Sequence, residues 1–150
     1  MKTPPNGLPL SPLATIVDGP LTPQAEALSH VGGAGGLGLS GAVLRFEGVV
    51  RRDEADPDRG GELRALEALE YQTYDPMAQR ELEALARGVA ERHGLRSIVA
   101  LHSRGRVHVG EVSFVLIVTA AHRAEAIAAL TEFVDRLKQD VPIWKRPVWA

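Results

Sequence analysis

Residues 111–137 read EVSFVLIVTAAHRAEAIAALTEFVDRL, and this stretch determines the fold class that the sequence predicts. Its first part, 111–119, is almost entirely apolar, which is typical of a central strand that is buried on both faces. A helix is expected at about 123–137, where apolar residues recur at spacings of three and four, namely Ile127, Leu130, Val134 and Leu137. A buried strand that leads directly into an amphipathic helix indicates a domain in which helices cover a sheet.

Further strand and helix patterns flank this stretch. Strands are expected at 14–17, 41–51, 63–71 and 96–102, with a short element at 106–109 between Gly105 and Gly110. Helices are expected at about 22–31 and from Asp75-Pro76 to just before Gly94, the second with an apolar stripe formed by Ala78, Leu82, Leu85 and Val89. The glycine-rich stretch 31–41 and the charged stretch 52–61 are expected to be loops.

This order of elements predicts an α+β fold. The chain is expected to form one two-layer domain over residues 14–150, with hairpins rather than strict βαβ alternation. The proline-rich residues 1–13 are expected to form a flexible tail.

The composition excludes several classes of protein. The 150 residues are 45% hydrophobic and 24% charged, which is enough apolar surface to bury a core. The formal net charge of −2 gives no indication of binding to nucleic acid or to an anionic membrane. The absence of cysteine excludes disulfides, thiolate nucleophiles and cysteine-ligated zinc. No apolar run approaches the roughly 20 residues of a membrane span, so a cytoplasmic protein is expected.

Two weak patterns bear on cofactors. Gly33, Gly35 and Gly38 match the G-x-G-x-x-G pattern, but the predicted order is helix before and strand after, the reverse of a dinucleotide site. The five histidines include no pair at the spacing of a helical metal site, although His102 and His108 are able to meet across a hairpin. We expect no resident cofactor and no metal.

Two groups of cationic residues are candidates for binding anions. His122 and Arg123 stand where the apolar strand ends and the helix begins, and backbone N–H groups and the helix dipole favour an anion at such a position. Arg123 is equally consistent with a solvated residue in the first turn. Arg51 and Arg52 follow a predicted strand, where a charged hairpin tip is the simpler interpretation.

The C-terminal residues 141–150, VPIWKRPVWA, are expected to be an irregular tail that packs through its two tryptophans onto the domain or onto a partner. Such packing holds Lys145 in place, and Lys138 at the end of the preceding helix is able to face the same pocket. A lysine that is partly desolvated among other cations acquires the capacity to act as a base or nucleophile. The alternative is that both are ordinary surface lysines.

Three motifs together resemble the large, catalytic subunit of molybdopterin synthase. They are F-x-G-x-V-R at 46–51, T-x-A-H-R at 119–123 and L-K-x-x-x-P-x-W-K-R at 137–146, and the last is the most specific. The resemblance extends from about Ala14 to Trp149. Val134 departs from it, because members of that family can carry methionine at this position.

The resemblance implies an α/β-hammerhead fold with an additional antiparallel sheet. It also implies a homodimer that binds one small ubiquitin-like subunit at each end. The C-terminal Gly-Gly of that partner, as a thiocarboxylate, supplies the sulfur that converts cyclic pyranopterin monophosphate to the dithiolene molybdopterin. By matching positions, Lys138 and Lys145 are the catalytic residues, Arg51, His122 and Arg123 line the substrate pocket, and Phe46 and Arg146 contact the partner's tail.

Two other classes of function remain open at this stage. One is a non-catalytic module that binds an anion or nucleotide through the Gly33–Gly38 loop. The other is a protein-interaction domain that uses the tryptophan-containing tail. Only the sulfurtransferase hypothesis gives Lys138 and Lys145 a special role.

Overall fold

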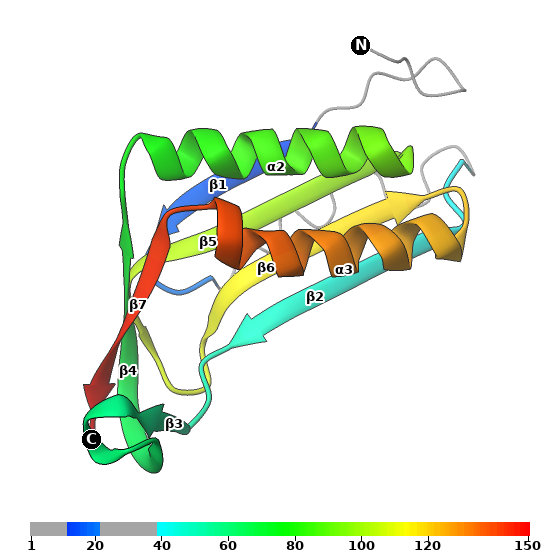
Figure 1. Ribbon diagram of the computed structural model, residues 1–150. Helices are drawn as coiled ribbons and strands as arrows, with labels where there is room; N and C mark the ends of the chain where they lie inside the picture. The colour runs from blue at the N-terminus through cyan, green and yellow to red at the C-terminus, as the bar shows by residue number, and fades with distance from the viewer. Residues whose placement is uncertain (1–11, 22–38) are drawn as a thin grey trace.

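A computed structural model describes residues 12–21 and 39–150 (Figure 1). The elements are β1 (Leu13–Asp18), β2 (Ala42–Val49), β3 (Asp53–Asp56), the 3₁₀ turn η2 (Pro57–Arg59), β4 (Glu62–Thr73), α2 (Met77–His93), β5 (Ser97–His108), β6 (Val112–Ala120), α3 (Arg123–Asp140) and β7 (Ile143–Trp149). The expected helix at 22–31 and most of the glycine-rich loop lie outside the described residues. So does the expected tail up to residue 11, while Leu13 already belongs to β1.

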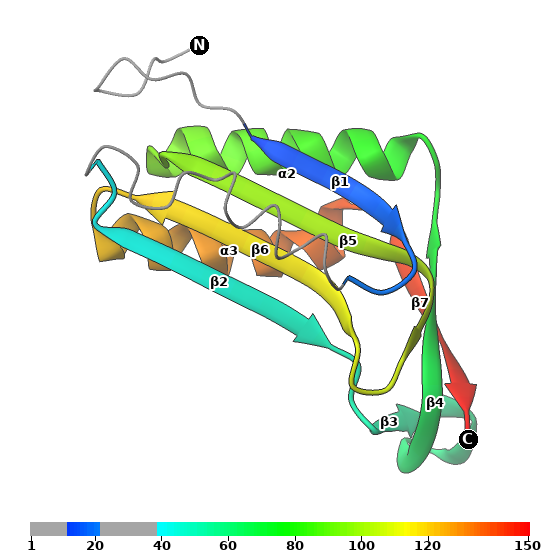
Figure 2. The ribbon, with the colours of Figure 1, turned by 180° about the vertical axis from the view of Figure 1, so that it is seen from behind.

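The main sheet has the order β1-β5-β6-β2, in which only the β1–β5 pair is parallel. Figure 2 shows these four strands side by side from the face opposite the helices. Strand β6 is buried from Ser113 to Ala120, so the prediction of a central apolar strand is confirmed. Its side chains alternate between the faces: Leu116 and Val118 join the core beneath the helices, and Val115 and Ile117 join the cluster on the other face.

Helices α2 and α3 lie on one face of this sheet, which gives the expected two-layer α+β arrangement (Figure 1). The apolar stripe predicted for α2 is confirmed, because all four of its residues are buried. The stripe predicted for α3 is partly wrong, since Ile127 is 53% exposed. The buried residues of α3 are Ala126, Ala129 and Phe133, whose spacing is also helical. Small alanines allow the helix to approach the sheet closely, and the Phe133 ring stacks on Phe114 with centroids 6.0 Å apart.

A second, antiparallel sheet forms around β4 and extends away from the helices (Figure 1). Strand β4 pairs with β3, with β7 and with the last residues of β5. Strand β5 therefore belongs to both sheets, and it changes partners at Gly105, where φ is +87°. A side chain is strained at that backbone angle, which explains a glycine inside a strand.

Three expectations from the sequence are corrected here. The charged stretch 52–61 is not only a loop, because it contains β3 and η2, stabilised by Asp56, whose carboxylate accepts from the Asp58 N–H and pairs with Arg64. The C-terminal residues are not irregular, because 143–149 form β7. His102 and His108 do not face each other across a hairpin, since both lie on β5.

In the described residues, no helix is long and apolar enough to cross a membrane.

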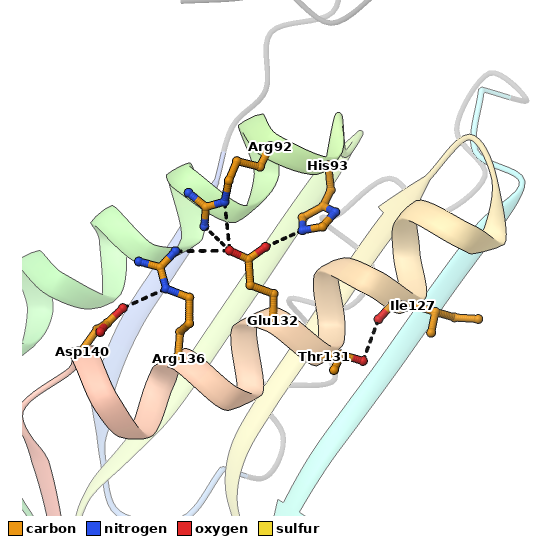
Figure 3. A network of polar contacts seen from close by, with 7 residues as sticks. All are labelled: Arg92, His93, Ile127, Thr131, Glu132, Arg136 and Asp140. Carbon is orange, nitrogen blue, oxygen red and sulfur yellow. Dashed lines mark hydrogen bonds and ion pairs between the residues drawn. The ribbon is translucent and has the colours of Figure 1, made fainter.

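A polar network joins α2 to α3 (Figure 3). Glu132 of α3 is its centre: one carboxylate oxygen accepts from Arg92 at 2.5 Å and from Arg136 at 3.2 Å, and the other lies 2.5 Å from His93 Nε2. Burial opposes the charged form of Glu132, but hydrogen bonds from His93, Arg92 and Arg136 outweigh it and lower the pKa to about 2. The network therefore fixes α3, which also carries Lys138, against α2.

The lowered pKa of Glu132 predicts a loss of stability in acid. An acid whose folded pKa lies below its unfolded pKa, here about 4.5, stabilises the fold above the unfolded value and loses this contribution as the pH falls toward about 2. We expect Glu132→Gln to lower the free energy of unfolding at pH 7 by about 1 kcal/mol and to flatten its decline below pH ~4.5. The measurement is chemical denaturation across pH. The exposed Glu91 of α2 provides the control, Glu91→Gln. If the free energy of unfolding falls equally steeply in acid for Glu132→Gln and for the native chain, the lowered pKa of Glu132 is contradicted.

Candidate functional site

A pocket of about 550 Å³ opens where the main sheet, the C-terminal half of α3 and the second sheet meet. It is lined by Phe46, Gly48 and Val49 of β2, Arg51, Tyr71 of β4, His102 of β5, Ser113 and Phe114 of β6, Val134, Leu137 and Lys138 of α3, and Ile143 and Lys145 of β7. A volume of several hundred cubic ångströms and a mostly apolar lining with a few polar groups are typical of small-molecule sites.

One wall of the pocket is aromatic. The Phe114 ring packs against Phe46 with centroids 6.0 Å apart and against His102 at 5.7 Å, and Tyr71 meets His102 edge-on at 5.2 Å. The Tyr71 hydroxyl and Ser113 Oγ are 3.0 Å apart, and Ser113 Oγ donates to the Gly48 carbonyl at 3.3 Å. The polar groups of this wall thus satisfy one another. Phe114 is buried and stacks on Phe133, so the partly exposed rings of Phe46 and Tyr71 are the ones that a planar ligand can reach.

Gly48, the glycine of the F-x-G-x-V-R motif, lies where β2 approaches β6 closely. A Cβ atom built at this position lies only 3.2 Å from Phe114 Cβ. The pairing of β2 with β6 also shifts register between Gly48 and Val49, as at a β-bulge. The motif therefore lies at the irregular end of β2, and this end positions Phe46 and Arg51 in the pocket lining.

His102 is the buried titratable group of the pocket wall. Its Nδ1 lies 2.8 Å from the Ser103 carbonyl, so Nδ1 carries the proton of the neutral ring and donates it to that oxygen. Burial lowers the pKa of His102 below its ordinary value of 6.5, and the hydrogen bond to Ser103 offsets only part of this effect. His102 is therefore a neutral, fixed component of the wall.

The cationic side of the pocket is formed by Lys138, Lys145 and Arg51. Lys145 is not surrounded by cations alone, as the sequence suggested: its Nζ donates to Glu54 Oε1 at 3.2 Å, and Arg51 Nη2 donates to the same oxygen at 3.3 Å. Burial opposes the charged form of Glu54, but the hydrogen bonds and charges of Lys145 and Arg51 hold its pKa below the ordinary range. Lys145 is therefore a pocket residue that is ion-paired with Glu54.

Four of the seven site residues expected from the sequence are brought together here: Phe46, Arg51, Lys138 and Lys145. Arg146 is exposed and follows Lys145 on β7, so strand alternation directs it to the opposite face. His122 and Arg123 are exposed at the first turn of α3, where His122 is the N-cap residue and makes no side-chain capping bond. They lie at the end of α3 remote from Lys138.

Sequence reasoning missed Glu54, Tyr71, His102 and Ser113 as parts of the site. Glu54 is hidden within a charged stretch that has no distinctive spacing. The fold brings together β4, β5 and β6, and only this makes neighbours of Tyr71, His102 and Ser113. The chain has only seven aromatic residues, and this rarity was a signal in the sequence that pointed to Tyr71.

Comparison with known proteins agrees with this architecture. The family described as MoaE protein matches residues 17–140. A rice (Oryza sativa subsp. indica) protein named molybdopterin synthase catalytic subunit is 38% identical over 110 residues, which are 73% of this chain and 53% of the rice protein. A protein of the same name from Cereibacter sphaeroides is 37% identical over 126 residues, covering 84% of this chain and 78% of that protein.

A solved structure of molybdopterin synthase from Staphylococcus aureus has the same fold. It superposes with a TM-score of 0.72 at 26% identity, covering 90% of each chain. The chain belongs to the MoaE protein family. It spans about half the length of the rice relative that it matches.

The buried, neutral His102 predicts a second dependence of stability on pH. For a histidine whose folded pKa lies below its unfolded pKa of about 6.5, the stabilising contribution is complete above pH ~6.5 and is lost as the pH falls from there toward the folded value. His102→Gln should therefore reduce the fall in melting temperature between about pH 7.5 and about pH 5.5. Calorimetry at the two pH values checks this, with exposed His108→Gln as the control. An undiminished fall in the His102 variant would refute a neutral, buried ring.

Proposed function

We propose that this chain is the catalytic subunit of a molybdopterin synthase. In this proposal it transfers sulfur from the C-terminal thiocarboxylate of a small ubiquitin-like partner to cyclic pyranopterin monophosphate, producing the molybdopterin dithiolene. The observation that carries the proposal is the pocket in which Lys138, Lys145 and Arg51 meet an aromatic wall. Membership in the MoaE family and the names of the relatives support the same activity.

The chain has no cysteine, so the sulfur must come from another molecule. Release of sulfur from a thiocarboxylate requires a nucleophile for the acyl carbon or an acid and a base that move protons. The two lysines of the pocket are the amines available for these steps. We assign acyl-group attack or proton transfer to Lys138 and Lys145.

The pocket has features that match a phosphorylated pterin. A planar, conjugated ring system can stack on the partly exposed rings of Phe46 or Tyr71. A phosphate favours charge-assisted hydrogen bonds from a guanidinium, which Arg51 supplies at the pocket mouth. The site needs no bound cofactor for these contacts.

The partner's tail, which ends in Gly-Gly, must extend into this pocket to place its last carbonyl beside the lysines. Phe46 is the contact that lies in the lining, whereas Arg146 can meet the partner only outside the pocket. We place this reaction in the cytoplasm, with the chain as the homodimeric core of a heterotetramer.

His122 and Arg123 require a second copy of the chain if they bind the same substrate. Arg123 and Lys138 are fifteen positions apart on α3, which at a rise of about 1.5 Å per residue places them roughly 22 Å apart. That separation exceeds the reach of one small ligand. In the proposed homodimer, the first turn of one α3 completes the pocket of the other copy.

The rival hypotheses have less support. The Gly33–Gly38 loop lies outside the described residues, so no observation favours a nucleotide module. Of the two tryptophans, Trp149 packs against the apolar cluster that includes Leu66 and Val107, with Arg64 over its ring at 4.9 Å. Trp144 is 57% exposed, but β7 as a whole is engaged by β4 within the same chain.

The lysine assignments predict that charge alone is not sufficient for catalysis. Arginine keeps the positive charge but is effectively never deprotonated. Lys138→Arg and Lys145→Arg should therefore fold normally and lower single-turnover product formation by at least about a hundredfold, at saturating thiocarboxylated partner and pterin. Lys2→Arg, at the third lysine of the chain, is the control and should retain full activity. Near-normal turnover in both arginine variants would show that these lysines act only as charges.

The second-copy assignment predicts complementation between two inactive variants. A heterodimer of a Lys138→Ala chain and an Arg123→Ala chain, isolated with two affinity tags, contains one intact site if Lys138 and Arg123 come from different copies. Its activity should be about half that of the native dimer, given two equivalent sites. If the mixed dimer is no more active than either single-variant homodimer, Lys138 and Arg123 do not come from different copies to form one site. In that case both residues act within one chain, or Arg123 does not belong to the site.

A further inference from the structure

We propose that Glu54 is a positioning residue, which holds Lys145 and Arg51 together at the pocket mouth before substrate arrives. The proposal rests on the proposed function, because it concerns the same site. Glu54 does not itself line the pocket, and no motif marks it. Its role follows from the two cations that share one of its oxygens.

The strand pairing makes Glu54 a fixed anchor. Glu54 belongs to β3, where it stands opposite Arg64 of β4, and Lys145 belongs to β7, where it stands opposite Tyr71 of the same β4. The ion pair therefore joins two strands that are both aligned on β4. The Glu54 side chain is only 18% exposed, whereas that of Lys145 is 53% exposed. The carboxylate is the more buried partner, so its position on β3 restricts where the Lys145 amine lies.

The charges around the pocket require such a carboxylate. Arg51, Lys138 and Lys145 all line it, and none of the described lining residues is acidic. The other polar side chains of the lining, Tyr71, His102 and Ser113, are not carboxylates. Glu54 is thus the anion that brings Arg51 and Lys145 to the same point despite their mutual repulsion.

This arrangement has opposite consequences for binding and for turnover. An anionic group of the substrate or of the partner's tail competes with Glu54 for the two cations, so removing the carboxylate leaves more positive charge to attract it. The Lys145 amine then lacks its anchor and samples more rotamers, which reduces the fraction in productive geometry. A residue with only a structural role would impair folding and binding together.

The kinetic test uses Glu54→Gln, which keeps the shape and removes the charge. Asp53→Asn is the matched control, because Asp53 is a neighbouring carboxylate on β3 that pairs with Arg52 outside the pocket. We expect Glu54→Gln to lower kcat about tenfold or more without raising KM for the pterin, with at most the small fall in melting temperature that follows from losing a partly exposed ion pair. Asp53→Asn should match the native chain. An unchanged kcat in Glu54→Gln, or an increased KM with a lowered melting temperature, overturns the proposal.

A second measurement does not depend on activity. The chain has three lysines, so acetylation of each can be quantified by mass spectrometry after brief treatment with acetic anhydride. The ion pair protects the Lys145 amine, and the ratio of Lys145 to Lys138 labelling should rise about two- to fivefold in Glu54→Gln but not in Asp53→Asn. In the native chain, raising NaCl from about 0.05 M to about 1 M should raise the same ratio, with little effect in Glu54→Gln.

The two measurements separate this proposal from the proposed function. Equal labelling ratios in the native chain and Glu54→Gln, at both salt concentrations, overturn the positioning role even if the native chain makes molybdopterin. If the ratio changes as expected and the native chain makes no molybdopterin with a thiocarboxylated partner, the ion pair is supported and the proposed reaction is wrong.

Discussion

The antiparallel pairing of β7 with β4 is the interaction on which the site depends. It extends from Thr73 opposite Ile143 to Leu66 opposite Trp149, and at its far end Trp149 packs into an apolar cluster. Because of this pairing, the chain that leaves α3 joins the second sheet. Lys145 therefore lies opposite Tyr71 and lines the same pocket as Lys138. Without it, two lysines seven residues apart would share no fixed geometry. By pairing with β4, the short strand β7 thus forms one wall of the pocket.

The pocket combines two electrostatic environments. Its aromatic wall contains a neutral His102 and hydroxyl groups that satisfy each other, so it presents little charge to a ligand. Its mouth carries three cations, of which two share the Glu54 carboxylate. An anion that enters meets these cations beside an apolar surface, where the attraction between charges is stronger than in bulk water. This asymmetry suits the proposed substrate, which has a planar ring system at one end and a phosphate at the other.

The sequence predicted the elements well where hydrophobic periodicity was strong. The apolar run of β6 and the stripe of α2 are buried as expected, whereas on α3 the choice of Ile127 was wrong because alanines and Phe133 form the inner face. Strand β7 was missed because VPIWKRPVWA contains two prolines and no alternation, and its strand conformation depends on pairing with β4. The motifs placed four residues in the site, but Glu54 and His102 depend on contacts between distant strands. For His122 and Arg123, the sequence alone does not show that they lie at the end of α3 away from this chain's own pocket, because that depends on how the helix packs on the sheet.

If this chain is the proposed synthase subunit, the C-terminus of its small partner protein reaches the lysines of this pocket. The most direct test is zero-length carbodiimide coupling of the chain to a ubiquitin-like partner ending in Gly-Gly, followed by mass spectrometry of the conjugates. We expect an isopeptide between the partner's terminal glycine and Lys138 or Lys145, which disappears when both are replaced by arginine. Coupling of the terminal glycine only to Lys2, or no conjugate through that glycine at all, would show that the partner's C-terminus does not reach these lysines.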